Sequence, residues 1–112
     1  MSEGDRSRTL VIVPTFDERD NILKLTPMIL DQSQDFDVLV VDDASPDGTG
    51  QIAEELAERF PKRVHVIHRP GKGGLGPAYL EGFRWALARP YERICEMDAE
   101  TRERAFTSLL NT

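Results

Sequence analysis

The chain has 112 residues, the length of one small domain. Its 20 acidic and 14 basic residues give a net charge of −6, which argues against nonspecific binding to nucleic acids or anionic membrane surfaces. No stretch approaches the ~20 apolar residues that a membrane-spanning helix needs, and the single cysteine, Cys95, fits a reducing compartment. We therefore expect a soluble cytoplasmic protein that binds no nucleic acid.

Short apolar runs alternate with stretches of helical periodicity, which predicts an α/β fold. The expected strands are 10–13, 38–41, 64–67 and 94–97. Pro14 is expected to end the first strand because proline cannot donate to a sheet ladder. Pro27 is expected to break a continuous helix, so the first main helix is placed after an N-cap at Thr26. Further helices are expected from about Thr49 to residue 60 and over 77–88, the last with a buried stripe of Tyr79, Phe83, Ala86 and Leu87.

Polar residues follow the first two strands, at the edge where open α/β sheets bind ligands. After the first strand, Phe16 stands beside acids, so this loop can stack on and hydrogen-bond a flat heterocycle, or an acid can cap the next helix. After the second strand, Asp42 and Asp43 are adjacent. Neighbouring carboxylates repel each other, so they need a metal, cationic partners or a ligand with hydrogen-bond donors. A capping or solvated-loop role is the alternative for one of the two.

The segment after the third strand is rich in glycine. Its spacing Gly71-x-Gly73-x-x-Gly76, with Glu96 and Asp98 about twenty residues later, matches the dinucleotide-binding fingerprint in outline. A plain flexible loop is the alternative.

The fourth expected strand leads directly into Asp98-Ala99-Glu100. Two carboxylates separated by one residue can share a divalent cation. Alternatively, Asp98 caps a short helix over 101–112, with Glu100 favourable to the helix dipole.

Four motifs occur in a familiar order and spacing: VPTFDERDN at 13–21, VDDASPDGT at 41–49, GLGPAYLEGF at 74–83 and MDAE at 97–100. Together they resemble the family 2 glycosyltransferases of GT-A fold, in the branch of the polyprenol (dolichol) monophosphate mannose synthases. The resemblance covers about residues 8–100. It implies the nucleotide-binding half of a Rossmann-like GT-A fold, three layers α/β/α with a mainly parallel sheet in the order 3-2-1-4.

The resemblance also implies nucleotide-binding residues. Pro14, Phe16 and Glu18 are expected to help hold the guanine nucleotide, and Val41 and Asp43 to contact its base or ribose.

At the Asp-x-Asp position of that family stand Asp98, Ala99 and Glu100. By resemblance they bind the diphosphate, Asp98 is the catalytic residue, and Asp98 and Glu100 hold Mg²⁺ or Mn²⁺. The implied reaction transfers mannose from GDP-mannose to a polyprenyl or dolichyl phosphate with inversion. Because the implied acceptor is a membrane lipid, the resemblance also implies that the protein lies peripherally at the cytoplasmic face of a membrane.

The sequence departs from the family pattern in three places. Phe16 replaces a common tyrosine, Glu100 replaces the second aspartate, and residues 101–112 do not resemble the segment found after the metal motif in the family. We therefore expect a flexible segment over 1–8, a donor-binding half domain over 9–100, and a short helix or tail over 101–112 that ends a truncated chain. A membrane-associated partner or self-association would cover the edge left by truncation. A noncatalytic remnant serving as an interaction module is the alternative, with an NAD-binding domain less favoured.

Overall fold

The computed structural model describes residues 8–16, 19–71 and 74–97, so the expected segments over 1–8 and 101–112 lie almost wholly outside it. No helix in these ranges is long and apolar enough to cross a membrane. In chain order the elements are β1 (Thr9–Thr15), α1 (Arg19–Gln32), β2 (Phe36–Asp42), α2 (Thr49–Arg59), β3 (Val64–His68), α3 (Leu75–Leu87) and β4 (Arg93–Glu96).

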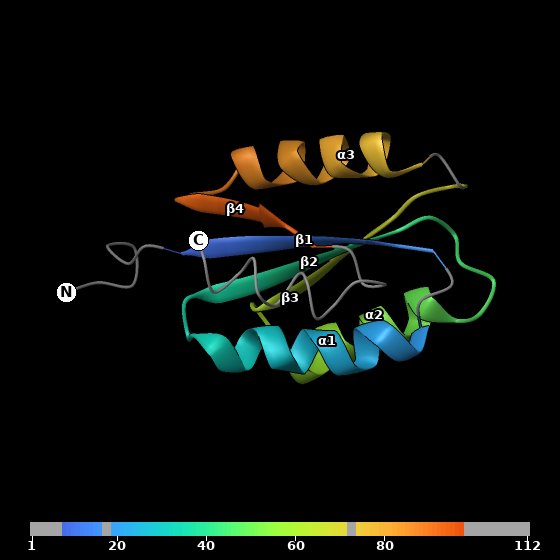
Figure 1. Cartoon of the computed structure of the whole chain (residues 1–112), viewed down its shortest axis with the longest axis horizontal. Coiled ribbons are helices and arrows are strands. Elements are labelled where there is room, and N and C mark those ends of the chain that lie inside the picture. Colours follow the sequence, from blue (N-terminus) through green and yellow to red (C-terminus); the bar gives the residue numbers. More distant parts are fainter. Residues whose placement is uncertain (1–7, 17–18, 72–73, 98–112) are drawn as a thin grey trace.

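The described strands form one sheet in the order β3-β2-β1-β4, and every neighbouring pair is parallel. Helices α1 and α2 cover one face of the sheet and α3 covers the other (Figure 1). The expected three-layer α/β/α architecture and its strand order are therefore confirmed.

The two central strands are apolar on both faces, and successive side chains contribute to different cores. Val11, Val13, Val38 and Val40 pack with α1 and α2 in one buried cluster. On the other face, Leu10, Ile12, Leu39 and Val41 pack with Ala78 and Ala86 of α3. Both helix layers are thus attached to the same pair of strands.

Strand β1 continues past Pro14 to Thr15, so the expectation that Pro14 ends it was wrong. Ile12 accepts a hydrogen bond from the backbone N–H of Met97, on the β4 side of the strand. Pro14 lies two residues later and turns its nitrogen to the same side, where β4 has already ended its pairing at Ile12. Among the residues that the structure describes, the missing donor therefore removes no ladder bond.

Helix α1 runs through Pro27, and the prediction that a helix begins there was also wrong. An internal proline costs roughly 3 kcal/mol and leaves the carbonyl of the residue four positions earlier without its helical donor. That residue, Leu23, is 44% exposed, so this face of the helix is open to water. On the inner face, Ile22 and Ile29 are fully buried on either side of the proline. Each such burial contributes about 1.5–3 kcal/mol, which together outweigh the interruption.

Helix α3 approaches the sheet through small residues. Ala78, Gly82 and Ala86 form its buried line, and a Cβ built at Gly82 would lie 2.8 Å from Cγ2 of Ile12. Leu87 is 76% exposed, so its expected place in the buried stripe was wrong. It follows Ala86 by one position, which turns it about 100° around the helix axis.

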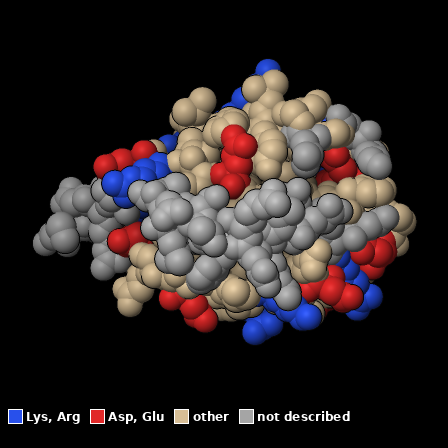
Figure 2. All heavy atoms as spheres, in the orientation of Figure 1, with Lys and Arg blue, Asp and Glu red and all other residues tan. Residues whose placement is uncertain are grey.

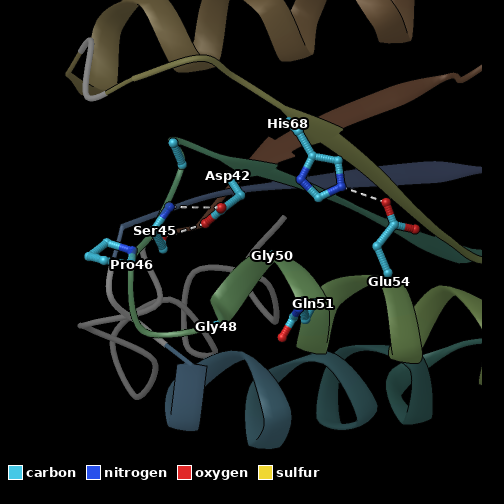
Figure 3. A pocket seen from close by; sticks show the side chains of 9 residues that line it. Asp42, Ser45, Pro46, Gly48, Gly50, Gln51, Glu54 and His68 are labelled. Carbon is cyan, nitrogen blue, oxygen red and sulfur yellow. Dashed lines mark hydrogen bonds and ion pairs between the residues drawn. The ribbon is translucent and has the colours of Figure 1, made fainter.

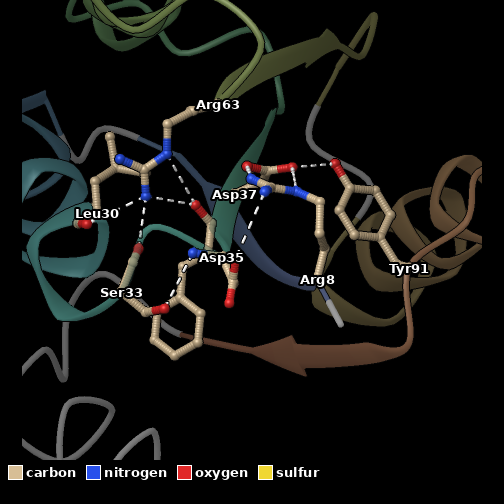
Figure 4. A network of polar contacts seen from close by, with 8 residues as sticks. Arg8, Leu30, Ser33, Asp35, Asp37, Arg63 and Tyr91 are labelled. Carbon is tan, nitrogen blue, oxygen red and sulfur yellow. Dashed lines mark hydrogen bonds and ion pairs between the residues drawn. The ribbon is translucent and has the colours of Figure 1, made fainter. Parts of the chain in front are cut away.

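Arg63, just before β3, joins helix α1 to the start of β2 at the end of the sheet shown in Figure 4. Its guanidinium donates to the carbonyls of Leu30, Ser33 and Phe36, with N–O distances of 2.7–3.3 Å. These bonds satisfy carbonyls at the end of α1, in the following loop and at the start of β2.

The buried carboxylate of Asp37 lies at the same end of the sheet (Figure 4). It accepts hydrogen bonds from Arg8 and, at 2.7 Å, from the Tyr91 hydroxyl. Burial and this hydrogen bond raise the pKa of Tyr91 well above its ordinary value. On the face that Figure 2 displays, the described acidic side chains lie in several small groups, some beside basic side chains and some apart from them.

Candidate functional site at the carboxyl edge of the sheet

The carboxyl ends of β1 and β2 lie side by side. Thr15 is the register partner of Asp42, and the backbone N–H of Asp43 donates to the Thr15 carbonyl at 3.1 Å. The loops predicted to bind a ligand therefore begin next to each other, at the edge where open α/β sheets bind ligands.

Asp42 organises the turn that follows β2. It is 2% exposed and accepts hydrogen bonds from the Thr15 hydroxyl at 2.7 Å and from the hydroxyl and backbone N–H of Ser45 at 2.6 and 3.1 Å. Its side chain reaches helix α2, because a Cβ built at Gly50 would lie 3.1 Å from its Oδ2. Asp42 therefore has a structural role, but as a buried carboxylate that fixes the turn, and not as the capping or solvated-loop residue considered as the alternative.

Asp43 faces the other side of the sheet. Its carboxylate is buried, with Oδ1 3.2 Å from Nη1 of Arg69, whose Nε lies 3.4 Å from Glu81 on helix α3. The cationic partner expected for adjacent carboxylates is thus Arg69, and it serves one of them. The alternation of side chains along a strand separates Asp42 from Asp43.

Asp47 connects the loops after β1 and β2. Its carboxylate accepts from the N–H and hydroxyl of Thr49, at the start of α2, and from the N–H of Arg19, at the start of α1. Burial raises the pKa of Asp47, but these hydrogen bonds outweigh it, so the pKa lies below its ordinary value. The preceding turn includes Ala44 at φ 53°, a left-handed conformation that is uncommon outside glycine.

An open pocket of about 530 Å³ lies on the Asp42 side, between the ends of β2 and β3 and the first turns of α2 (Figure 3). Ser45, Gln51, Glu54 and His68 are among its lining residues, and His68 Nε2 lies 2.5 Å from Glu54 Oε2. The pocket faces α2, whereas Asp43 faces α3. It is therefore separate from the side on which the candidate nucleotide-binding carboxylate lies.

The structure brings together some of the expected site residues. Pro14 is the register partner of Val41, one position before the pair of Thr15 and Asp42, and Asp43 follows that pair. Phe16 follows the end of β1 and is half-buried. Glu18 falls outside the described residues, as do the expected diphosphate and metal residues Asp98, Ala99 and Glu100.

Arg69 belongs to this site and was not predicted. In the sequence it stands beside Pro70 and the glycine-rich segment, where nothing distinguishes it from a loop residue. Its position becomes informative only once β3 pairs with β2, because that pairing places the residue after His68 beside the Asp42–Asp43 turn.

A family model described as glycosyl transferase family 2 matches residues 10–111. The chain belongs to glycosyl transferase family 2.

Relatives within this family carry more specific names. Over 93 residues, or 83% of this chain, it is 53% identical to a polyprenol monophosphomannose synthase of Mycolicibacterium smegmatis and 50% identical to an undecaprenyl-phosphate mannosyltransferase of Micrococcus luteus. Among solved structures, it is similar to a mannosyltransferase from Pyrobaculum calidifontis in complex with GDP-Man and Mn²⁺, with a TM-score of 0.65 and 28% identity over 77% of this chain. These matches span 35%, 38% and 26% of the respective proteins, so the chain corresponds to about a third of their length.

Within this family-2 chain, the residues available for a metal are oxygen ligands. Asp98 and Glu100 offer carboxylates, the donor type that Mg²⁺ and Mn²⁺ prefer. They follow Met97, whose N–H is bonded to Ile12 at 2.9 Å, so β4 brings the chain to the same edge as Thr15 and Asp43. Among residues 8–16, 19–71 and 74–97, no group of three His, Cys, Asp or Glu residues could hold a metal ion. Asp98 and Glu100 lie outside these ranges, and their carboxylates are oxygen donors of the type that fits a divalent cation.

Proposed function

We propose that residues 9–100 form the donor-binding half domain of a glycosyltransferase that transfers mannose from GDP-mannose to a polyprenyl or dolichyl phosphate. The observation that carries the proposal is the register of β1 and β2, which sets Pro14 beside Val41 and places Asp43 just beyond them, in a chain of this family. The names of the mannosyltransferase relatives support the sugar and the class of acceptor.

In this proposal the two adjacent strand ends recognise the nucleotide. Pro14, Phe16 and Glu18 line one side of it, with Phe16 offering an aromatic surface for stacking. Val41 and Asp43 contact the base or ribose from the other strand. A buried carboxylate suits this role because the N–H or O–H donors of a base or ribose can bind it in a site of low dielectric.

The sugar diphosphate is assigned to Asp98, Ala99 and Glu100. Asp98 and Glu100 would hold Mg²⁺ or Mn²⁺, which would neutralise the negative charge that develops on the departing GDP. Glu100 is one methylene longer than aspartate, and it can still supply a carboxylate oxygen to the same ion. Asp98, nearest to β4, is the residue to which we assign the catalytic role.

The reaction implied by these roles is a direct displacement. A phosphate oxygen of the acceptor attacks C1 of mannose, the bond from C1 to the β-phosphate oxygen breaks, and its electron pair leaves with GDP. The configuration at C1 therefore inverts. A phosphate monoester is already anionic near neutral pH, so the attack requires no strong general base.

We assign acceptor binding to a surface outside residues 9–100. A membrane-associated partner or a second copy of the chain, packed along the β4 edge of the described sheet, is our proposal for part of that surface. Since the acceptor is a membrane lipid, we place the protein peripherally at the cytoplasmic face of a membrane.

The donor site is tested by calorimetric titration of the chain with GDP, in Mn²⁺ and separately in EDTA. We expect GDP to bind in Mn²⁺. The affinity should be at least tenfold weaker in EDTA, which removes the metal ion, and in Asp98→Ala, which removes a ligand carboxylate. Loss of a residue that only supports a metal ligand already costs about 10–100-fold in metal affinity. Glu58→Ala, an exposed acid near the far end of α2, is the matched control and should bind as the parent does.

Two results would contradict the proposal. A folded chain that binds no GDP in either condition would leave the noncatalytic interaction module as the better explanation. Metal-independent binding of NADH in a parallel titration would instead support the dinucleotide interpretation of the glycine-rich segment.

A further inference from the structure

Arg69 connects three parts of the carboxyl edge. Its backbone N–H donates to the carbonyl of Asp42 at 2.7 Å, which fixes the chain that leaves β3 against the end of β2. Its side chain continues across the edge, with Nη1 3.2 Å from Asp43 and Nε 3.4 Å from Glu81. One arginine therefore links β2, β3 and α3.

The two carboxylates around Arg69 differ in exposure. The side chain of Asp43 is 7% exposed and that of Arg69 13%, whereas that of Glu81 is 46% exposed. A buried carboxylate is costly without a nearby positive charge, and the guanidinium of Arg69 supplies one to Asp43. Glu81 holds the other side of the guanidinium from the surface of α3.

The contact between Arg69 and Asp43 is one of charge. Within the described part of the chain, Nη1 of Arg69 donates no hydrogen bond. A carboxylate has about four acceptor positions, so a carboxylate can face a guanidinium and also accept a hydrogen bond from a ligand. The Arg8–Asp37 pair differs, because there the guanidinium donates hydrogen bonds to the carboxylate at the opposite end of the sheet.

We propose that Arg69 is a positioning residue of the donor site: it orients the Asp43 carboxylate toward the nucleotide, and Glu81 on α3 holds Arg69 in that position. This inference rests on the proposed function, since it assigns Arg69 to the same nucleotide site. Arg69 acts through Asp43, so its effect on affinity requires the Asp43 carboxylate.

The test is a double-mutant cycle on GDP affinity in Mn²⁺, measured by calorimetry. Asp43→Asn and Arg69→Met should each weaken GDP binding by about tenfold or more, and the double variant should be no weaker than the weaker single variant, because coupled residues are not additive. Arg69→Lys keeps the charge without the planar fork, so its loss should fall between parent and Arg69→Met. Glu81→Gln should weaken binding by about two- to threefold, as expected for a partly exposed contact.

Arg8→Met is the matched control for losing an ion-paired arginine. It should lower the thermal midpoint and leave the GDP affinity of the folded chain unchanged, since the Arg8–Asp37 pair lies at the other end of the sheet.

The outcomes separate the inference from the proposed function. If the parent binds GDP and Arg69→Met binds equally well, or if the losses of Arg69→Met and Asp43→Asn simply add, Arg69 does not position Asp43. Should Arg69→Met fail to fold, parental affinity in both Arg69→Lys and Glu81→Gln overturns the inference. A folded parent that binds no GDP overturns the proposed function, and this inference with it.

Discussion

Adjacent residues at the end of β2 have different tasks because their side chains leave the strand on opposite sides. The hydroxyls of Thr15 and Ser45 satisfy Asp42, which shapes the turn. Arg69 forms an ion pair with Asp43, which lies on the side toward α3. Hydroxyl donors fix a carboxylate in a local structure, whereas a carboxylate that faces a cation can accept further hydrogen bonds from a ligand. We therefore infer that the aspartate with the charged partner is the one suited to a ligand.

His65 illustrates a different residue-scale effect, at a position far from the candidate site. Its ring packs against Trp85, with centroids 4.9 Å apart, and Arg89 stacks on the same indole at 3.6 Å. Burial lowers the pKa of His65; Asp37 acts in the opposite sense, and Arg89 lowers the pKa further. The folded state thus favours the neutral imidazole.

This shift predicts a pH dependence of stability. The unfolded chain binds the proton with a pKa of about 6.5 and the folded chain with a lower one, so the contribution of His65 is complete above pH ~6.5 and is lost as pH falls through the folded pKa. His65→Phe keeps a ring against Trp85 and cannot titrate. Urea unfolding between pH ~5 and ~7.5 should show a steeper acid loss for the parent than for the variant. Parallel curves would show that His65 does not contribute.

At the scale of elements, α3 can approach β1 closely because Gly82 has no side chain. Gly82 lies over Ile12, where an added Cβ would come within 2.8 Å of Cγ2 and 3.1 Å of Cδ1. By contrast, a Cβ added at Gly76, in the first turn of the same helix, would meet nothing within 4 Å. Packing against β1 therefore requires glycine at position 82 but not at position 76.

Substitution of these glycines should have opposite effects. Gly82→Ala should lower the free energy of unfolding by about 1–3 kcal/mol, because overpacking outweighs the helix propensity that alanine gains. Gly76→Ala should be neutral or stabilising by up to about 1 kcal/mol. Urea denaturation followed by circular dichroism measures both. Equal effects of the two substitutions would mean that the close approach of α3 to Ile12 does not constrain the helix.

At the scale of the whole molecule, the two apolar clusters share the strands β1 and β2. Val11 and Leu10 are neighbours in one strand, yet each belongs to a different cluster. Loss of either cluster exposes one face of the same sheet to water, so we expect both helix layers to unfold together.

Leu25 and Trp85 allow this cooperativity to be measured, because they lie in different layers. Leu25 of α1 is fully buried, and Trp85, the single tryptophan, packs on the α3 side. Leu25→Ala should cost about 2–5 kcal/mol, and its urea midpoint should fall equally by tryptophan fluorescence and by far-ultraviolet circular dichroism. The exposed neighbour Leu23 is the control, with Leu23→Ala expected to change stability by less than about 0.5 kcal/mol. A fluorescence midpoint that stays at the parental value would indicate two independent layers.

Local patterns of the sequence determined much of the architecture. Uninterrupted apolar runs such as 38–41 identify strands buried on both faces, because no other environment accommodates four successive apolar side chains in a strand. Turn-forming residues after β2 and the amphipathic stretch of α2 set where these elements begin and end. The motifs around Pro14, Asp43 and Asp98 were sufficient to indicate the family that the comparison confirmed.

Tertiary structure decided the features that depend on contacts between distant parts of the chain. Pro14 and Pro27 lie inside regular elements because β4 ends early beside one and core burial stabilises the helix around the other. Asp42 and Asp43 have identical side chains, and only the positions of α2, α3 and Arg69 give them separate roles. A local pattern records the preferences of neighbouring residues, whereas an ion pair such as Asp43–Arg69 forms only when strand pairing brings its two residues together.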